Sequence, residues 1–481
     1  MSLKYRELKR EALHLLRGPS FVMIFLLTSI AAAVVYTMRG TFLIYATVQV
    51  FHDMMNLLIG LLAGIVVTTY SITIVALQLT STQFSPRVIR HLLSQDLYTQ
   101  ITLGSFLSWI IFCLIIKFWI LSPLPFDAPP GYTAILWINA AIYGAFFLLA
   151  VLLPHFILTI AQNINAAHII RKIALHTLDV VAEEAQAWEQ MEKAEAPAAS
   201  ENDCYVKSKR FGYIQEIDYE AIRHWLRRHP GVLFVEQSRS VGAFLTAGAP
   251  IFRFRLSATL AEAQRHQLMQ KTGHFLQRCY SVGQFRSFRQ DVHFGIRQIV
   301  DIAIRAISPA VNDPTTAINC LDYLGQLVLS LTEYRMPTGR VNRYRNEPLY
   351  VRTVTFDQIV SQAFDQIYHF GRHDYAVLSR TFSLLNTCVR AVSKQEHLYV
   401  LGDEIGEFVE DLLQQIEMET IQAHVSQVQL ARLAGIARRT CDDWLAKTEE
   451  FAEMGNKMRL LHEKIQNDSR QLRALHDALN S

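Results

Sequence analysis

Charged side chains recur at helical spacing in residues 291–307. The three that repeat every four residues are Arg297, Asp301 and Arg305. They lie opposite the apolar face of the same predicted helix and form a ladder on its outer side. Such a ladder could bind an anion or a partner protein, although a solvated charge ladder explains the same pattern.

The next segment could hold an anion at a helix start. Its polar residues are Asn312, Asp313, Thr315 and Thr316. Pro314 disfavours the helical conformation for Asp313 and suits the first helical position, so Asp313 is the predicted N-cap of a helix running to about residue 331. Free amides at such a start can bind an anion, and capping alone also accounts for these residues.

The remaining reactive residues form no catalytic or metal-binding signature. His369, His373 and Asp374 have the spacing of metal ligands, but the segment lacks the glutamate of a zinc-protease helix and contains a glycine. The six cysteines are scattered without a CxxC pair, which is typical of isolated reduced thiols. We therefore expect no metal, no cofactor and no enzymatic activity.

The net charge of the chain is +3, and the sequence contains no run of basic residues. These two features argue against nucleic acid as a partner.

A predicted membrane helix over residues 56–79 and its continuation carry polar side chains on two faces. One face holds Thr68, Ser71, Gln78 and Thr82, and the other holds Thr69, Thr73, Thr80 and Gln83. In lipid, such side chains must turn toward protein or water. They either line a path for solutes or pack in the bundle, bonded to carbonyls of their own helix. Gly60 and Gly64 form a GxxxG motif that favours close helix packing.

Four apolar segments predict a transmembrane domain over residues 1–160. They cover about residues 21–38, 56–79, 101–121 and 133–153, and about 20 residues are needed to cross the hydrocarbon core. A cleavable signal peptide is the alternative for the first segment, but its removal conflicts with the charge pattern. Lysine and arginine concentrate before the first span, between the second and third, and after the fourth, which predicts a cytoplasmic location for both termini.

The residues behind the spans predict a cytoplasmic α+β region. We expect an amphipathic helix and linker over residues 161–204, a small β-rich module over 205–256, and a helical domain over 257–481. Apolar residues recur at heptad spacing near the end, namely Met458, Leu461, Ile465, Leu472, Leu475 and Leu479. This pattern is typical of a coiled coil between subunits or of an amphipathic helix packed on its own domain. The predicted fold class is a mainly α membrane protein with a four-helix transmembrane bundle.

Two long stretches resemble a bacterial family of predicted membrane proteins, the domain of unknown function two-two-five-four. They read SITIVALQLTSTQFSPR over residues 71–87 and QDVHFGIRQIVDIAIRAISPAVNDPTTA over residues 290–317. The resemblance covers nearly the whole chain. It implies a bacterial inner-membrane protein with four N-terminal spans, and it implies no particular activity, ligand or catalytic residue.

Two functions fit these observations. The first is a homo-oligomeric, channel-like protein for passive passage of ions or small solutes, with the second span lining the path. No Asp, Glu or Arg lies in the middle of a span, which disfavours ion-coupled transport, and four spans are too few for a roomy pore in one subunit. The second is a membrane-anchored regulatory or scaffolding protein whose cytoplasmic region binds a partner or a small anion.

Overall fold

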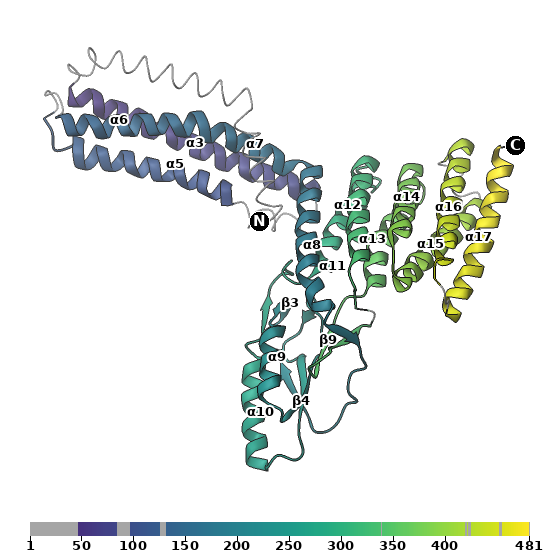
Figure 1. Ribbon diagram of the computed structural model, residues 1–481. Coiled ribbons are helices and arrows are strands. Elements are labelled where there is room, and N and C mark those ends of the chain that lie inside the picture. The colour runs from purple at the N-terminus through teal and green to yellow at the C-terminus, as the bar shows by residue number, and fades with distance from the viewer. Residues whose placement is uncertain are drawn as a thin grey trace. The chain divides into compact units, whose positions relative to one another are not determined.

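The computed structural model describes residues 47–83, 97–125, 131–337, 339–418, 421, 425–451 and 455–480 (Figure 1). It divides into two compact units, Met1–Asn165 and Ala166–Ser481. The predicted first span, residues 21–38, lies outside the described residues.

The first unit is a bundle of long apolar helices. They are α3 (Val48–Gln83), α5 (Leu97–Ile115) with its π-helical continuation η1 (Ile116–Leu121), and α6 (Tyr132–Phe147), which continues through the π-helical η2 (Leu148–Leu152) into α7 (Leu153–Ile164). Among the described residues, three segments are long and apolar enough to cross a membrane: Val48–Ala76, Gly104–Leu121 and Trp137–Gln162. They correspond to the predicted second, third and fourth spans, with the second beginning earlier and the fourth ending later.

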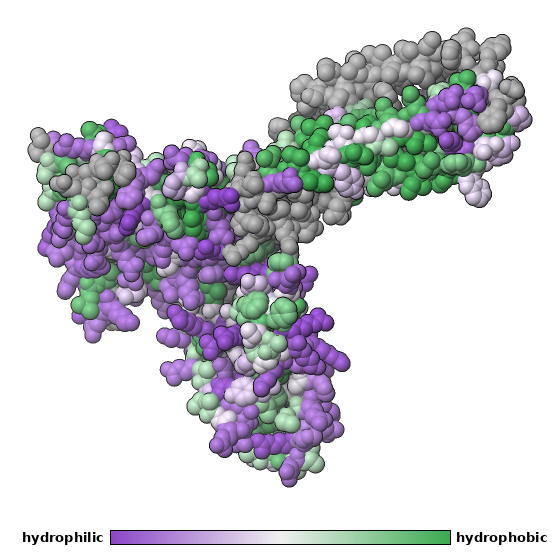
Figure 2. All heavy atoms as spheres, turned by 180° about the vertical axis from the view of Figure 1, so that it is seen from behind, coloured by the Kyte–Doolittle hydropathy of each residue, from purple (hydrophilic) through white to green (hydrophobic). Residues whose placement is uncertain are grey.

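The surface of the first unit is largely hydrophobic, whereas that of the second is largely polar (Figure 2). Exposed apolar side chains include Leu57, Val67, Ile111, Phe118 and Trp119. Such a contiguous apolar surface suits contact with lipid and would be costly in water. The chain is thus built as a membrane-embedded part followed by a polar part.

Close packing in the first unit joins α5 and α6. Trp109 donates its indole N–H to the carbonyl of Ala141 at 3.0 Å. Gly144 leaves room for this indole, because a Cβ at that position would lie 1.8 Å from Trp109 Cζ2. A glycine outside the GxxxG motif therefore provides this close helix approach.

Mixed β-structure opens the second unit. One sheet has the strand order β1-β8-β9-β4-β6-β2 and the other has the order β5-β3-β7. The strands are β1 (Met191–Lys193), β2 (Asp203–Lys207), β3 (Gly212–Ile217), β4 (Val232–Gln237), β5 (Phe244–Leu245), β6 (Pro250–Leu256), β7 (Tyr280–Gly283), β8 (Val341–Tyr344) and β9 (Leu349–Arg352). The helices α9 (Tyr219–Arg228) and α10 (Glu262–Leu276) accompany them.

The β-structure extends beyond the predicted module of residues 205–256. The strand β1 lies in the predicted linker and pairs with β8, while β9 runs parallel to β4. β7, β8 and β9 lie in the segment predicted as helical. These strands have only three or four residues each, so their partners rather than local pattern stabilise them.

Helices fill the rest of the second unit. They are α8 (Ala166–Trp188), α11 (Val292–Ala306), α12 (Pro314–Glu333), α13 (Phe356–Gly371), α14 (Tyr375–Ala391), α15 (Gln395–Glu417), α16 (Gln427–Thr448) and α17 (Asn456–Asn480). The helices α11, α13, α15 and α17 pack in sequence as one layer, and α12, α14 and α16 form a second layer against them (Figure 1). The result is an array of helical hairpins of the kind found in α-solenoids.

The C-terminal heptad residues belong to this array. Met458, Leu461, Ile465 and Leu472 are buried, and α17 packs on α15 and α16 of the same chain. Asp468, which interrupts the apolar stripe, is also buried. Of the two predicted alternatives, packing on its own domain is the one that the structure contains.

Candidate functional site

The predicted polar faces of α3 point to different surroundings. Thr69 is buried and Thr73 is half-buried toward the bundle, whereas Thr68, Ser71 and Gln78 are exposed. The side chains of Thr80, Thr82 and Gln83 lie outside the described residues. The two faces inferred from helical spacing are therefore an inner face and an outer face.

Hydroxyl groups of α3 bond within their own helix. Thr68 donates to the carbonyl of Gly64 at 2.8 Å, Thr69 to Val66 at 2.9 Å, Ser71 to Val67 at 2.8 Å and Thr73 to Thr69 at 2.7 Å. Each hydroxyl donor is thereby satisfied without water, while its oxygen keeps acceptor capacity. These bonds fit both alternatives that the sequence left open, because Thr68 and Ser71 remain exposed on the outer face.

Small and polar residues line the outer face of α3. A Cβ added at Gly60 or at Gly64 would meet no described atom within 4 Å. At 100° per residue, the side of the helix that carries these glycines also carries Thr68, Ser71 and Gln78. We call this side, formed by Leu57, Gly60, Gly64, Thr68, Ser71, Val75 and Gln78, the open face of α3. Within the described part of the chain, no helix packs closely on its glycines.

The charge ladder of α11 holds neighbouring helices together. Arg297 Nε lies 2.7 Å from Asp301 Oδ1, and Arg297 Nη1 donates to Gln366 Oε1 of α13 at 2.8 Å. Arg305 is exposed at the last turn, where a cation favours the helix dipole. Arg297 therefore contacts a second helix, and Asp301 pairs with it within α11.

Hydrogen bonds close the loop before α12. Asp313 Oδ1 accepts from the amide of Thr316 at 3.1 Å, and the Thr316 hydroxyl donates to Asp313 Oδ2 at 2.5 Å. The amide of Asp313 donates to the carbonyl of Ala306 at 2.8 Å. Asn312 has φ 51°, and it is the one non-glycine residue with positive φ in the part of the chain that the structure describes. The predicted N-cap is confirmed, and capping explains the roles of Asp313 and Thr316, while Thr315 is exposed.

The two histidines with metal-ligand spacing stand at a helix boundary. The helix α13 ends at Gly371, and Asp374 caps α14 by accepting from the amides of Ala376 and Val377 at 2.8 and 3.0 Å. No group of three or more His, Cys, Asp or Glu side chains suited to a metal ion occurs among the described residues.

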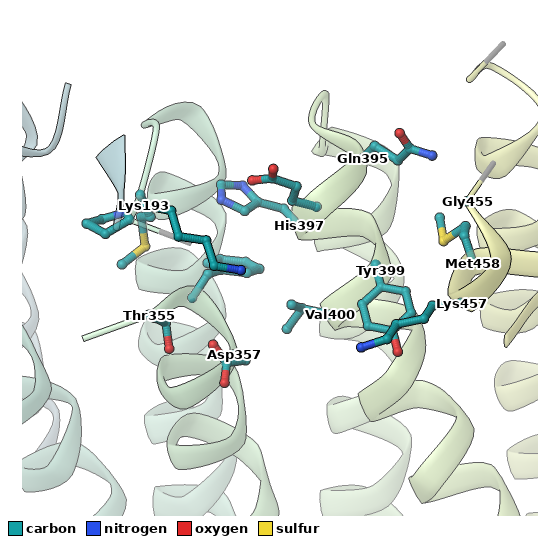
Figure 3. Close-up of a pocket in the computed structure, with 14 residues that line it drawn as sticks. Lys193, Thr355, Asp357, Gln395, His397, Tyr399, Val400, Gly455, Lys457 and Met458 are labelled. Carbon is teal, nitrogen blue, oxygen red and sulfur yellow. The ribbon is translucent and has the colours of Figure 1, made fainter. Parts of the chain in front are cut away.

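A cavity of about 550 Å³ lies where α13, α15 and α17 begin. Its wall includes Lys193 from β1, Thr355 and Asp357 at the start of α13, His397 and Tyr399 of α15, and Lys457 of α17 (Figure 3). Sequence analysis did not identify it, because its lining residues come from segments up to 265 positions apart, between Lys193 and Met458.

His397 is the most buried ionisable side chain of this wall, with an exposed fraction of 4%. Burial, assisted by the nearby Lys394, lowers the pKa of His397 to about 4, so the imidazole is neutral at physiological pH. The ring stacks on Phe356 with centroids 4.2 Å apart. It bonds to the backbone of Thr332, while its Nδ1 has no partner among the described residues.

Comparison with known proteins places the chain in a family. Residues 18–387 match the family described as predicted membrane protein (DUF2254). Uncharacterized proteins of Mycobacterium tuberculosis and Mycobacterium bovis are 27% identical over 328 residues, which cover 66% of this chain and 59% of the relatives' length. No solved structure matches the chain. With its three described candidate spans and a family match over most of its length, the chain belongs to the DUF2254 family of predicted membrane proteins.

Proposed function

We propose that the chain is a subunit of a homo-oligomeric, channel-like assembly in the bacterial inner membrane. The observation that carries this proposal is the open face of α3. It combines Gly60 and Gly64, on which no described residue packs, with the exposed Thr68 and Ser71. Small residues allow another helix to approach closely in lipid. A second copy of α3, or water enclosed by a ring of copies, would cover this face.

The chemistry of α3 favours passive passage over coupled transport. No Asp, Glu, Lys or Arg occurs in residues 56–83, so this stretch holds no side chain that could relay a proton or bind a driving cation by charge. Hydroxyl oxygens that keep acceptor capacity can solvate a passing solute weakly. In this proposal, the basic residues that flank the spans place both termini and the second unit in the cytoplasm.

Site-directed crosslinking in native membranes tests the assembly. Ser71→Cys on the open face is expected to form a disulfide-linked dimer with a second chain, whereas Thr73→Cys on the inner face is not. Cys113 is the one native cysteine in the N-terminal 200 residues and is buried, so replacing it by Ser removes the background. In a second variant, a cysteine is also introduced within residues 21–38, where the sequence has none. Crosslinking of Ser71→Cys only to that cysteine of its own chain would contradict the proposal.

A flux assay in reconstituted vesicles tests the channel-like activity. Ion or small-solute flux is expected, and a thiol reagent added to the Ser71→Cys variant is expected to reduce it, with Thr73→Cys as the matched control. If the protein crosslinks as an oligomer but shows no flux of ions or small neutral solutes, the proposed oligomer is supported and the proposed channel-like activity is contradicted.

A membrane-anchored regulatory protein is the second candidate function. The array α11–α17 and its cavity favour it, because hairpin arrays present extended surfaces to partners. This function predicts that Thr68→Ala and Ser71→Ala leave activity unchanged, whereas changes in the second unit abolish it.

A further inference from the structure

Three exposed phenylalanines gather at the small sheet β5-β3-β7 of the second unit. Phe211 precedes β3 and is 75% exposed, Phe244 of β5 is 53% exposed, and Phe285 after β7 is 40% exposed. Phe244 lies opposite Tyr213 of β3, with ring centroids 5.1 Å apart. Large apolar side chains that cluster on a surface mark a contact with a partner or a membrane, whereas single ones need no explanation.

The sheet turns these rings outward. Ile214 of β3 and Leu245 of β5 are at most 1% exposed and form the inner face of the sheet. Successive side chains alternate between the two faces of a strand, so the residues next to them lie on the outer face. The side chain of Gln215 donates to the carbonyl of Phe285 at 2.8 Å and thereby holds the segment after β7 against β3.

A tightly bonded loop presents basic side chains beside Phe211. Ser208 is 4% exposed, and its amide donates to the carbonyl of Ala249 at 2.9 Å. Its hydroxyl oxygen accepts from the amide of Arg210 at 3.2 Å. With Ser208 fixed in this way, Lys209, Arg210 and Phe211 follow one another as exposed residues.

The chain segments that form this surface are basic. Residues 204–215, 237–250 and 280–290 contain no Asp or Glu. Their basic residues are Lys207, Lys209, Arg210, Arg239, Arg286 and Arg289. The carboxylates that flank these segments in the sequence each pair with an arginine, and they are Asp203, Glu216, Glu236 and Asp291.

Only part of the positive charge of these segments is compensated. Arg286 and Arg289 belong to the ion pairs just described. The other basic residues of the three segments make no ion pair within the described part of the chain. Unpaired cations therefore lie beside exposed aromatic rings. We call this side of the sheet the basic aromatic surface, formed by Lys207, Lys209, Arg210, Phe211, Tyr213, Phe244 and Phe285.

The helix α8 connects this sheet to the end of a candidate span. Phe288, three residues after Phe285, packs against His176 of α8 with ring centroids 5.0 Å apart. The span Trp137–Gln162 ends fourteen residues before His176. Most of this connection is helical, with a rise of about 1.5 Å per residue, so it covers at most about 30 Å. A membrane surface is therefore within reach of the sheet.

We propose that the basic aromatic surface docks on anionic lipid headgroups of the membrane that holds the first unit. Aromatic rings favour the boundary between water and hydrocarbon, and lysine and arginine are attracted to an anionic leaflet. A second copy of the chain fits less well, because a symmetric contact would bring Lys209 and Arg210 against their own counterparts. This inference concerns the second unit and does not rest on channel formation.

Photocrosslinking of the full chain in lipid nanodiscs tests the proposal. The photoreactive p-benzoylphenylalanine is introduced in place of Phe211, and the intact mass after irradiation identifies what it has bonded to. In discs that contain phosphatidylglycerol, a phospholipid adduct is expected. The same probe in place of Leu233, which is 47% exposed on β4, is expected to give no such adduct.

Variants of the basic residues test the charge complementarity. Lys209→Gln and Arg210→Gln are each expected to lower the yield of the phospholipid adduct by up to about five-fold, the effect of removing one cation from an anionic surface. Arg228→Gln is the matched control, because Arg228 is an exposed arginine of the same unit but lies on α9. Unchanged melting temperatures would show that these variants fold.

The outcomes of these experiments decide between lipid and protein as the occupant. An adduct of position 211 with a second protein chain, or no phospholipid adduct at that position, would overturn the proposal. Equal yields in pure phosphatidylcholine and in discs with phosphatidylglycerol would also overturn it, because the unpaired cations would then have no role in the contact.

Discussion

Arg286 holds both carboxylate oxygens of Asp291, with Nε 2.9 Å from Oδ2 and Nη2 2.9 Å from Oδ1. The same carboxylate caps α11, because Oδ1 accepts from the amide of Phe294 at 3.0 Å. Gly242 lies against this pair, and a Cβ there would be 2.1 Å from Asp291 Oδ2. This ion pair, with Asp291 buried and Arg286 half-buried, thus lies at the start of α11, and the turn before β5 packs against it through Gly242.

This arrangement predicts that Gly242→Ala destabilises the second unit strongly. Gly242 has φ +82°, and Gly248 has φ +84° but open space around its Cβ. Gly248→Ala is expected to cost about 1 kcal/mol from backbone strain alone, whereas Gly242→Ala is expected to cost about 3 kcal/mol because it also displaces Asp291. Thermal unfolding of the two variants measures the difference, and equal losses would contradict the packing role of Gly242.

The buried Glu404 of α15 predicts a pH dependence of stability. Burial, followed by a hydrogen bond with Asp365, raises the pKa of Glu404 to about 10. The unfolded side chain ionises near pH 4.3, so the folded state holds the extra proton between these values and its stability falls as the pH rises through that window. Glu407 is a further charged group that acts on Glu404. Asp403, Glu410 and Lys464 act in turn on Glu407.

Glu404→Gln removes this titration while keeping a polar group at the position. Its melting temperature is expected to fall less than that of the wild type between pH 5 and pH 9, and the two curves are expected to converge toward acidic pH. Parallel curves over the whole range would show that Glu404 ionises normally.

Packing of Trp109 on Gly144 predicts a sensitive position in the first unit. Gly144→Ala is expected to destabilise the bundle by about 2 kcal/mol, because the methyl group would collide with the indole. Gly104→Ala on α5 meets open space and is expected to be neutral or mildly stabilising, since alanine favours helix. The temperature at which each detergent-solubilised variant aggregates on heating measures the difference in stability between Gly144→Ala and Gly104→Ala.

The buried face of α17 predicts which of its apolar residues stabilise the second unit. Ile465→Asp is expected to cost about 3 kcal/mol or more, because it places an unpaired carboxylate in the core of the array. Leu460→Asp, at a position with 68% exposure, is expected to be nearly neutral. If Ile465→Asp instead separated subunits without lowering the melting temperature, α17 would be an intersubunit coiled coil.

Local signals in the sequence determined much of the secondary structure. Asp313 was predicted to cap a helix running to about residue 331, and it caps α12 (Pro314–Glu333). Capping, proline geometry and apolar periodicity act over a few residues, so they can be read without the fold. For the same reason, three of the four predicted spans have counterparts among the described helices, and the two polar faces of α3 follow from spacing alone.

Only the tertiary structure decided which of these features meet. Spacing distinguishes two faces of α3, but neighbouring helices determine that Thr69 is inside and Thr68 outside. The short strands β8 and β9 are stable only beside β1 and β4, and the cavity wall takes Lys193 and Lys457 from distant parts of the chain. Such contacts depend on long-range packing, for which a single sequence carries no periodic signal.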